Sequence, residues 1–277
     1  MDQPTPLNVD TTWVSLLHEV LSTGCIVSPR GMKTKEMLGA YSIHATYAVL
    51  SIPERKLNYR FMAAEPLWIM AGHDDVDGIA KYNAQIANYA PLGDRFFGAY
   101  GPRWVKQRDA MIDKLLADRD TRQAVVSFWT DNPPDGVDVA CNILLVFSIR
   151  GRQLNLTVSA RSKDIWLGLP YDVFGFSMLL HRVLCVLNGT RRNGKRYFDP
   201  PLLPGLITFF DSSLHIYERY WDAAVKIVQA YHNVTLPSEL VAIPYIPACD
   251  GDWNFYQTYL TDRRELKDNS PLFSEMS

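Results

Sequence analysis

The chain has 277 residues and a formal net charge of −2, with 47% hydrophobic and 21% charged residues. This balance is typical of a soluble globular protein, and the lack of a long basic run argues against general binding to nucleic acid or membranes. The four cysteines are widely spaced without a Cys-x-x-Cys pair, so we expect free thiols in a reducing compartment and no metal site.

No targeting segment is apparent in the sequence. The first ten residues lack a basic segment followed by an apolar run, so we expect no signal peptide. No apolar run reaches the ~18 residues that a membrane-spanning helix needs. We therefore expect a cytoplasmic protein.

The first elements in the chain are a helix, a turn and a strand. Apolar periodicity within residues 11–24 predicts an amphipathic helix that ends at the glycine. Residues 28–31 (Ser-Pro-Arg-Gly) predict a turn carrying Arg30. Residues 37–50 are rich in aromatic and β-branched types and predict a strand.

Two further helices are predicted before the middle of the chain. Residues 60–70 are mostly apolar, with Glu65 as the one acid, and Pro66 is expected to bend this helix. A glutamate in such a stretch is costly to bury without partners, so Glu65 either faces a groove or serves a purpose. Residues 107–116 predict the second helix.

The stretch from Cys141 to Asp172 predicts a β-hairpin followed by a helix. Apolar residues alternate on both sides of a turn at residues 150–152, and an apolar helix is expected over residues 173–187. A thiol, a guanidinium, a hydroxyl and two carboxyl groups are carried on contiguous strands that can bring them to one cavity. These groups belong to Cys141, Arg161, Ser162, Asp164 and Asp172.

This order of residues resembles the thymidylate synthase superfamily. The nucleophilic cysteine, the Arg-Ser pair, the following Asp and the Gly-Leu-Pro-aromatic run are matched by Cys141, Arg161, Ser162, Asp164 and residues 168–171. Arg161 lies 161 − 141 = 20 residues after the cysteine, as in the family pattern. The last position departs, because members that act on uracil carry Asn, and Asp172 is what dCMP hydroxymethylases have.

The resemblance covers roughly residues 13–225 and implies the fold. We expect an α/β (α+β) thymidylate synthase fold, with a large mixed β-sheet flanked by helices and packed against its copy in a homodimer. A single domain is expected over residues 1–277, in which residues 226–277 form a divergent C-terminal extension.

The resemblance also implies how a nucleotide is held. The phosphate is expected to bind Arg30, Arg161 and Ser162 of one subunit and Arg122 of its partner, while Gln123 replaces a second arginine of the family. Arginine forks suit a phosphate dianion. The 3′-hydroxyl of the sugar is expected to bind His215 and Tyr217.

The catalytic roles follow from the same resemblance. Cys141 is the nucleophile that adds to C6 of a pyrimidine, and the neighbouring Arg161 is expected to lower the pKa of its thiol. Tyr100 assists proton transfer, and Glu65 orients or deprotonates a water. Asp164 contacts the pterin of the co-substrate 5,10-methylenetetrahydrofolate, which Glu65 also approaches.

The base is expected to be read by Asp172. Cytosine presents an N3 acceptor and a 4-amino donor, which a carboxyl group matches if it shares a proton with N3. Synthases also place a tryptophan over the reaction intermediate, whereas residues 86–89 here are Ile-Ala-Asn-Tyr. An open site favours water over hydride, so the sequence predicts a (d)CMP 5-hydroxymethylase.

Three alternatives stay open at this point. The enzyme could act on dUMP, as a hydroxymethylase or a true thymidylate synthase, and the sequence does not decide between CMP and dCMP. The chain could also be an inactive relative that binds nucleotide or RNA. Retention of the nucleophile together with the ligand residues argues against the last.

Overall fold

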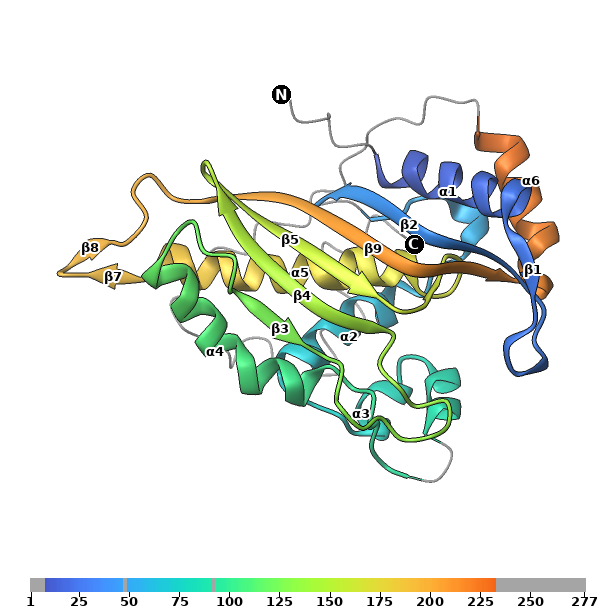
Figure 1. The fold of residues 1–277 in the computed structure, drawn as a ribbon, viewed down its shortest axis with the longest axis horizontal. Coiled ribbons are helices and arrows are strands. Elements are labelled where there is room, and N and C mark those ends of the chain that lie inside the picture. The colour runs from blue at the N-terminus through green and yellow to red at the C-terminus, as the bar shows by residue number, and fades with distance from the viewer. Residues whose placement is uncertain (1–7, 47–48, 91–92, 233–277) are drawn as a thin grey trace.

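The computed structural model describes residues 8–46, 49–90 and 93–232, which form a mixed β-sheet flanked by helices (Figure 1). In this part of the chain the sheet has seven strands in the order β1-β2-β9-β5-β4-β3, with β6 paired to β9. The predicted fold class is confirmed. The sheet strands are β1 Cys25–Val27, β2 Thr34–Ala45, β3 Val125–Ser127, β4 Asn142–Arg150, β5 Gln153–Ala160, β6 Lys163–Asp164 and β9 Leu203–Tyr217, and β7 Arg191–Arg192 pairs with β8 Lys195–Arg196 in a separate ribbon.

Helices pack on the sheet and at one end of it (Figure 1). They are α1 Val9–Thr23, α2 Tyr59–Met70, α3 Val76–Ala80, α4 Gly101–Ala117, α5 Leu169–Gly189 and α6 Trp221–Tyr231. The predicted helices are all present, with small differences at their ends. α1 is capped by Asn8, whose side chain accepts from the Asp10 N–H, and α2 continues through Pro66. The strand expected at residues 37–50 ends at Ala45.

The predicted hairpin is β4 and β5. Gly151 adopts a φ of +56°, the left-handed conformation that glycine allows at a tight turn, and Arg150 pairs with Gln153. Alternate residues of β4 (Leu145, Phe147 and Ile149) are fully buried, which fixes the register of the hairpin against the core. The same packing therefore fixes the end of the hairpin away from the turn, where Cys141 directly precedes β4.

Strand β9 holds the sheet together at its centre. It runs antiparallel to β2 and parallel to both β5 and β6. This topology places His215 directly opposite Asp164, although 51 residues separate them along the chain (215 − 164). The loop after β6 is tied to α1, because the Trp13 indole donates to the Ile165 carbonyl at 2.7 Å.

Helix α5 is the core helix of the molecule. Pro170 lies in its first turn, where proline costs no hydrogen bond, and Leu179, Leu180 and Val183 are fully buried. By length and hydropathy an 18-residue window of α5 could span a bilayer, contrary to the expectation from the sequence. However, 67% of that window is buried inside the molecule, so its apolar character is explained by packing.

Candidate active site

Most of the predicted site residues gather at the end of the sheet away from the β4–β5 turn. Asn142, the residue after Cys141, pairs with Ala160, the residue before Arg161, so the thiol and the guanidinium leave adjacent strands side by side. The remaining groups come from five elements: Glu65 on α2, Tyr100 at the N-terminus of α4, Asp164 on β6, Asp172 in the first turn of α5, and His215 and Tyr217 on β9.

Cys141 is exposed to solvent in this region. Its sulfur is 3.8 Å from Nη2 of Arg161. The side chain reaches solvent, but neighbouring groups bury much of it, and this burial raises the pKa of the thiol. The nearby cations Arg161, Lys163 and Arg30 lower the pKa by less than burial raises it. The expected direction of the Arg161 effect is correct, but burial outweighs it, so the pKa of the thiol lies above its usual value.

Arg161 also forms hydrogen bonds with the segment that precedes Cys141. Its Nε donates to the Ala140 carbonyl at 2.9 Å and its Nη2 to the Val139 carbonyl at 3.1 Å. The guanidinium lies 5.9 Å from the Trp129 ring. Arg30 is exposed on the turn after β1 with a φ of 53°, a conformation that few non-glycine residues adopt. The positive charges of Arg161 and Arg30 both act on the Cys141 thiol.

A buried lysine joins the nucleophile strand to Asp172. The Lys163 ammonium donates to Asn142 Oδ1 at 2.6 Å and forms an ion pair with Oδ2 of Asp172. Asn142 in turn donates from Nδ2 to Oδ1 of Asp172 at 3.3 Å and to the Tyr100 hydroxyl at 3.0 Å. The charges of Lys163 and Asp172 also act on the Cys141 thiol, so Cys141 and Asp172 lie near each other, as the base-reading hypothesis requires.

Glu65 faces the same cluster. Burial raises its pKa to about 8, the negative charge of Asp172 adds to this effect, and Lys163 opposes it. Glu65 is therefore mostly protonated at neutral pH. In this state it can donate a proton, and the role expected from the sequence, to orient or deprotonate a water, stays a prediction.

Tyr100 is fixed close to the nucleophile. Its hydroxyl accepts from the backbone N–H of Asn142 at 3.1 Å, and its ring stacks on Phe128. Burial, with a smaller contribution from the charge of Cys141, raises the pKa of its hydroxyl. Tyr100 stays a neutral phenol that can donate or relay a proton.

Asp164 has one satisfied and one unsatisfied oxygen. Its Oδ1 accepts from the N–H groups of Trp166 and Leu167, both at 2.8 Å, which shapes the turn into α5. Its buried Oδ2 has no hydrogen-bond partner, and burial raises the pKa of the carboxyl group. This oxygen suits a donor group on a bound molecule. His215 is buried nearby, and its ring is perpendicular to the Tyr217 ring at 5.4 Å.

Tyr89 approaches the site from the segment that lacks the tryptophan. It is 51% exposed at the end of a short 3-10 helix. Burial and the charges of Tyr217, Asp164 and Cys141 raise the pKa of its hydroxyl, so it lies near the nucleophile. No tryptophan lies between Trp68 and Trp104 to cover this region.

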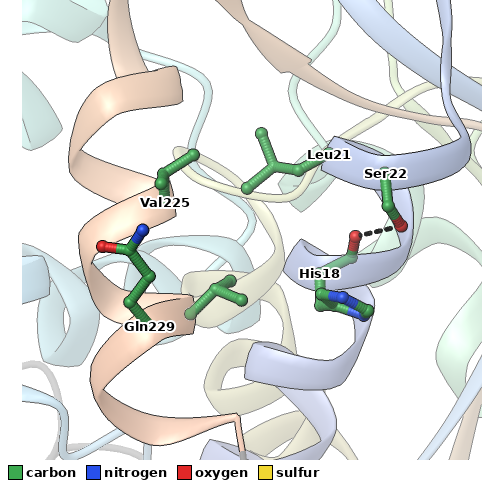
Figure 2. A pocket seen from close by; sticks show the side chains of 6 residues that line it. His18, Leu21, Ser22, Val225 and Gln229 are labelled. Atoms are coloured by element: carbon green, nitrogen blue, oxygen red, sulfur yellow. Dashed lines mark hydrogen bonds between the residues drawn. The ribbon is translucent and has the colours of Figure 1, made fainter.

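The structure does not bring Arg122 into the site of its own chain. It is exposed between α4 and β3, and its proposed reach into a partner subunit stays a prediction. A shallow groove elsewhere, between α1 and α6, is lined by residues such as His18, Leu21 and Val225 and contains none of the predicted site residues (Figure 2).

Two residues of the site were missed from the sequence. The sequence pattern assigns no role in the site to Lys163 or Asp211. Asp211 is buried on β9 with Oδ1 unpartnered, and burial raises its pKa to about 6 while Lys163 lowers it. The available signal was the presence of charged residues in otherwise apolar strands.

The comparisons with known proteins identify the family of the chain. The thymidylate synthase family pattern matches residues 11–238. A deoxyuridylate hydroxymethyltransferase of Bacillus phage SP01 is 32% identical over 260 residues, which cover 86% of this chain and 63% of the relative. A deoxyuridylate hydroxymethyltransferase of Pseudomonas phage M6 is 36% identical over 142 residues, which cover 47% of this chain and 40% of that relative. The chain thus spans less than two thirds of the length of either relative, but its own match is extensive: it belongs to the thymidylate synthase family.

Proposed function

We propose that the chain is a 5-hydroxymethylase of pyrimidine deoxynucleoside monophosphates. The observation that carries this proposal is the hydrogen-bonded link from the strand of Cys141 through Asn142 to Asp172. It supports one site that contains the Cys141 thiol and the Asp172 carboxyl group, with Arg30 and Arg161 near the thiol as candidates to bind a phosphate. The relatives named above support the same reaction class.

The thiol activates the ring by covalent addition. Deprotonated Cys141 forms a bond to C6 as the C5=C6 π electrons move to C5 and the ring carbonyl, which makes C5 nucleophilic. Tyr100 and protonated Glu65 lie close enough to exchange protons with the ring and with water. C5 then bonds to the methylene carbon of the co-substrate, and loss of the C5 proton with departure of tetrahydrofolate leaves an exocyclic methylene on the ring. Water adds its oxygen to this methylene and gives up a proton as the thiolate leaves C6, which restores the C5=C6 double bond.

The one-carbon unit comes from methylenetetrahydrofolate as co-substrate. The residues present fit a folate on one observation: the unpartnered Oδ2 of Asp164 is a buried acceptor able to bind a pterin N–H. Tyr89 is half-exposed near Cys141. Its ring is smaller than the indole of the tryptophan that synthases place over the reaction intermediate, so it would cover less of that intermediate. Water access at this position supports hydration over reduction.

Uracil is the first candidate base, and deoxyuridylate the first candidate substrate. Both relatives named above are deoxyuridylate hydroxymethyltransferases, and an oxygen of Asp172 can accept from the uracil N3–H. Protonated Glu65 is available to donate toward O4, directly or through water. Cytosine is the second candidate, because Asp172 replaces the Asn of uracil-specific members and can accept from the 4-amino group.

Steady-state kinetics with tritium-labelled dUMP, dCMP and CMP tests this proposal. The wild type is expected to release tritium from C5 of dUMP with the highest kcat/KM and to form 5-hydroxymethyl-dUMP by mass analysis. Asp172→Asn is expected to raise the ratio of dUMP to dCMP kcat/KM by about tenfold or more, because an amide supplies both a donor and an acceptor. Asp113→Asn on exposed α4 is the control.

The outcomes separate the alternatives. A wild type that prefers dCMP would establish the second candidate, and thymidylate as the product would establish a synthase. No release from any nucleotide would contradict the proposed function and favour an inactive relative.

A homodimer through the outer face of the sheet is part of the proposal. Tyr41 of β2 and Phe210 of β9 pair across the two strands, and their rings stack. The two residues are 65% and 51% exposed, and Val125 of β3 is also exposed. An apolar surface on a sheet face is typical of an interface, and a second copy would bury it.

Charge introduced into this face is expected to separate the subunits. The variant Tyr41→Glu/Phe210→Glu should elute as a monomer in size-exclusion chromatography with light scattering, because four buried carboxylates per dimer would lack partners. Val225→Glu on exposed α6 should remain a dimer. A monomeric wild type, or a dimeric double variant, would contradict this interface.

A further inference from the structure

The ribbon of β7 and β8 projects from the body of the molecule at the end that carries the β4–β5 turn (Figure 1). Four of the six residues 191–196 are basic: Arg191, Arg192, Lys195 and Arg196. All four are exposed, and within residues 8–46, 49–90 and 93–232 none of them forms an ion pair. This basic ribbon therefore presents positive charge to solvent without a neighbouring acid to neutralise it.

The shape of the basic ribbon is fixed at its tip and at its root. At the tip, Asn193 and Gly194 have φ angles of 53° and 77°, as a tight two-residue hairpin turn requires. At the root, the Tyr197 N–H donates to the Thr190 carbonyl at 2.9 Å, and the Tyr197 hydroxyl donates to the Leu116 carbonyl at the end of α4. A partner therefore meets a preformed element, which lowers the entropic cost of binding.

Like charges face each other across the basic ribbon. Arg191 pairs with Arg196, and Arg192 pairs with Lys195. Successive residues of a strand point to opposite faces, so each face of the ribbon carries one pair of cations. Like charges directly opposite each other destabilise a strand pair. An anion bound at each face would remove this repulsion, so both faces favour negative groups.

Cations on two opposite faces suit a partner that places anions on both sides of the ribbon. A flat anionic surface, such as lipid headgroups or an acidic protein face, meets only one face. The major groove of B-form DNA is about 12 Å wide, has phosphates along both walls and admits a two-stranded β-ribbon. The major groove of duplex RNA is too narrow for this. Charge and shape together therefore favour duplex DNA.

Further cations surround the root of the basic ribbon. Arg119, after α4, and Arg150 and Arg152, at the β4–β5 turn, are all exposed. Arg152 donates to the Pro201 carbonyl at 3.1 Å and Arg119 donates to the Gly151 carbonyl, so these segments lie beside one another. The sequence argued against general nucleic-acid binding from a net charge of −2, which averages this positive end with an acidic remainder.

We propose that the basic ribbon binds the phosphates of duplex DNA from within the major groove. Arginine and lysine contacts to phosphate carry no sequence information, so binding is expected to be independent of sequence and to weaken steeply with salt. None of the four cations belongs to the site around Cys141. The inference therefore goes beyond the proposed function and does not depend on it.

Fluorescence anisotropy of the full chain with a labelled duplex tests the inference. A duplex of about 12 base pairs, roughly one helical turn, leaves room for one ribbon. The wild type is expected to bind with a Kd on the order of 10⁻⁵ M at low salt. Because four phosphates are neutralised, the slope of log K against log salt concentration is expected to be about −3.6.

Removal of all four charges is expected to abolish most of this binding. The variant Arg191→Gln/Arg192→Gln/Lys195→Gln/Arg196→Gln should bind at least about tenfold more weakly and lose most of the salt slope. The matched control removes the same charge from exposed positions elsewhere and should bind within about twofold of the wild type. Its substitutions are Lys56→Gln, Lys81→Gln, Lys106→Gln and Lys226→Gln.

Two double variants test whether both faces of the ribbon meet phosphate. Arg191→Gln/Arg196→Gln removes the charge of one face, and Arg192→Gln/Lys195→Gln removes that of the other. In a groove, each should reduce the magnitude of the slope by about 1.8. An effect confined to one of the two variants would show that the partner is a flat anionic surface and would overturn the inference.

The remaining outcomes also decide the matter. Single-stranded DNA or duplex RNA that binds as tightly as duplex DNA would contradict insertion into the major groove. A wild type that does not bind the duplex, or a quadruple variant that binds like the wild type, would overturn the role of the ribbon. Melting temperatures should be no lower in the variants, because each substitution removes a contact between like charges. All of these failures would leave the proposed hydroxymethylase reaction standing.

Discussion

Replacing Cys141 by serine is expected to lower turnover by at least about 10³-fold, because an alcohol is a far weaker nucleophile at the pyrimidine C6 than a thiolate. Binding of the nucleotide is expected to stay within about threefold, since the arginines near the thiol are unchanged. Tritium release from C5 measures the first effect and calorimetry the second. Folding should be unaffected because Cys141 is exposed.

Cys25 provides the matched control for this variant. It is an exposed free thiol on β1, and Cys25→Ser should retain full activity. Substantial turnover by Cys141→Ser would show that ring activation does not proceed through this sulfur. Loss of nucleotide binding in the same variant would show that Cys141 has a structural role instead.

Glu65→Gln is expected to lower kcat by about 10²- to 10³-fold, because glutamine fills the same space but cannot donate a proton to the ring or to water. In the wild type, kcat is expected to fall as pH rises through about 8, where Glu65 loses its proton. The residual activity of the variant should lack this decline. Rate profiles against pH for both proteins measure the difference.

The same carboxyl group makes stability depend on pH. Its pKa rises from 4.5 in the unfolded chain to about 8 in the folded protein, so between these values the folded state binds a proton that the unfolded state lacks. The contribution of Glu65 to stability is therefore lost progressively as pH rises from about 4.5 to 8. Urea unfolding should show a flatter dependence in Glu65→Gln, whereas Glu19→Gln on α1 should follow the wild type. Equal slopes for Glu65→Gln and the wild type would contradict the burial of this acid.

The hairpin and the core helix could be predicted because their signals are local. Alternation on either side of Gly151 specifies two strands, and the apolar run after Pro170 specifies a helix. These elements carry Cys141, Arg161 and Asp172, so their meeting at one end of the sheet could be expected. The central position of β9 depends on pairing between distant segments, which the resemblance supplied and periodicity did not.

The protonation states could not be predicted from the sequence. For Cys141, the neighbouring Arg161 was visible in the sequence, but the larger effect of burial depends on how distant segments pack around the thiol. The contacts of Lys163 could not be predicted from the sequence either. On a strand of two residues nothing local indicates which side chain turns inward, and its contact with Asp172 required α5 to be placed. The first interpretation of Asp172 as a cytosine reader omitted that partner.

Covalent trapping tests the central claim most directly. Incubation with methylenetetrahydrofolate and either 5-fluoro-dUMP or 5-fluoro-dCMP should stall the reaction, because fluorine cannot leave C5 as a cation. Intact-protein mass spectrometry is expected to show one nucleotide bound per chain, and peptide mapping should place it on Cys141. An unmodified protein with both nucleotides, or a nucleotide attached to another residue, would contradict the account.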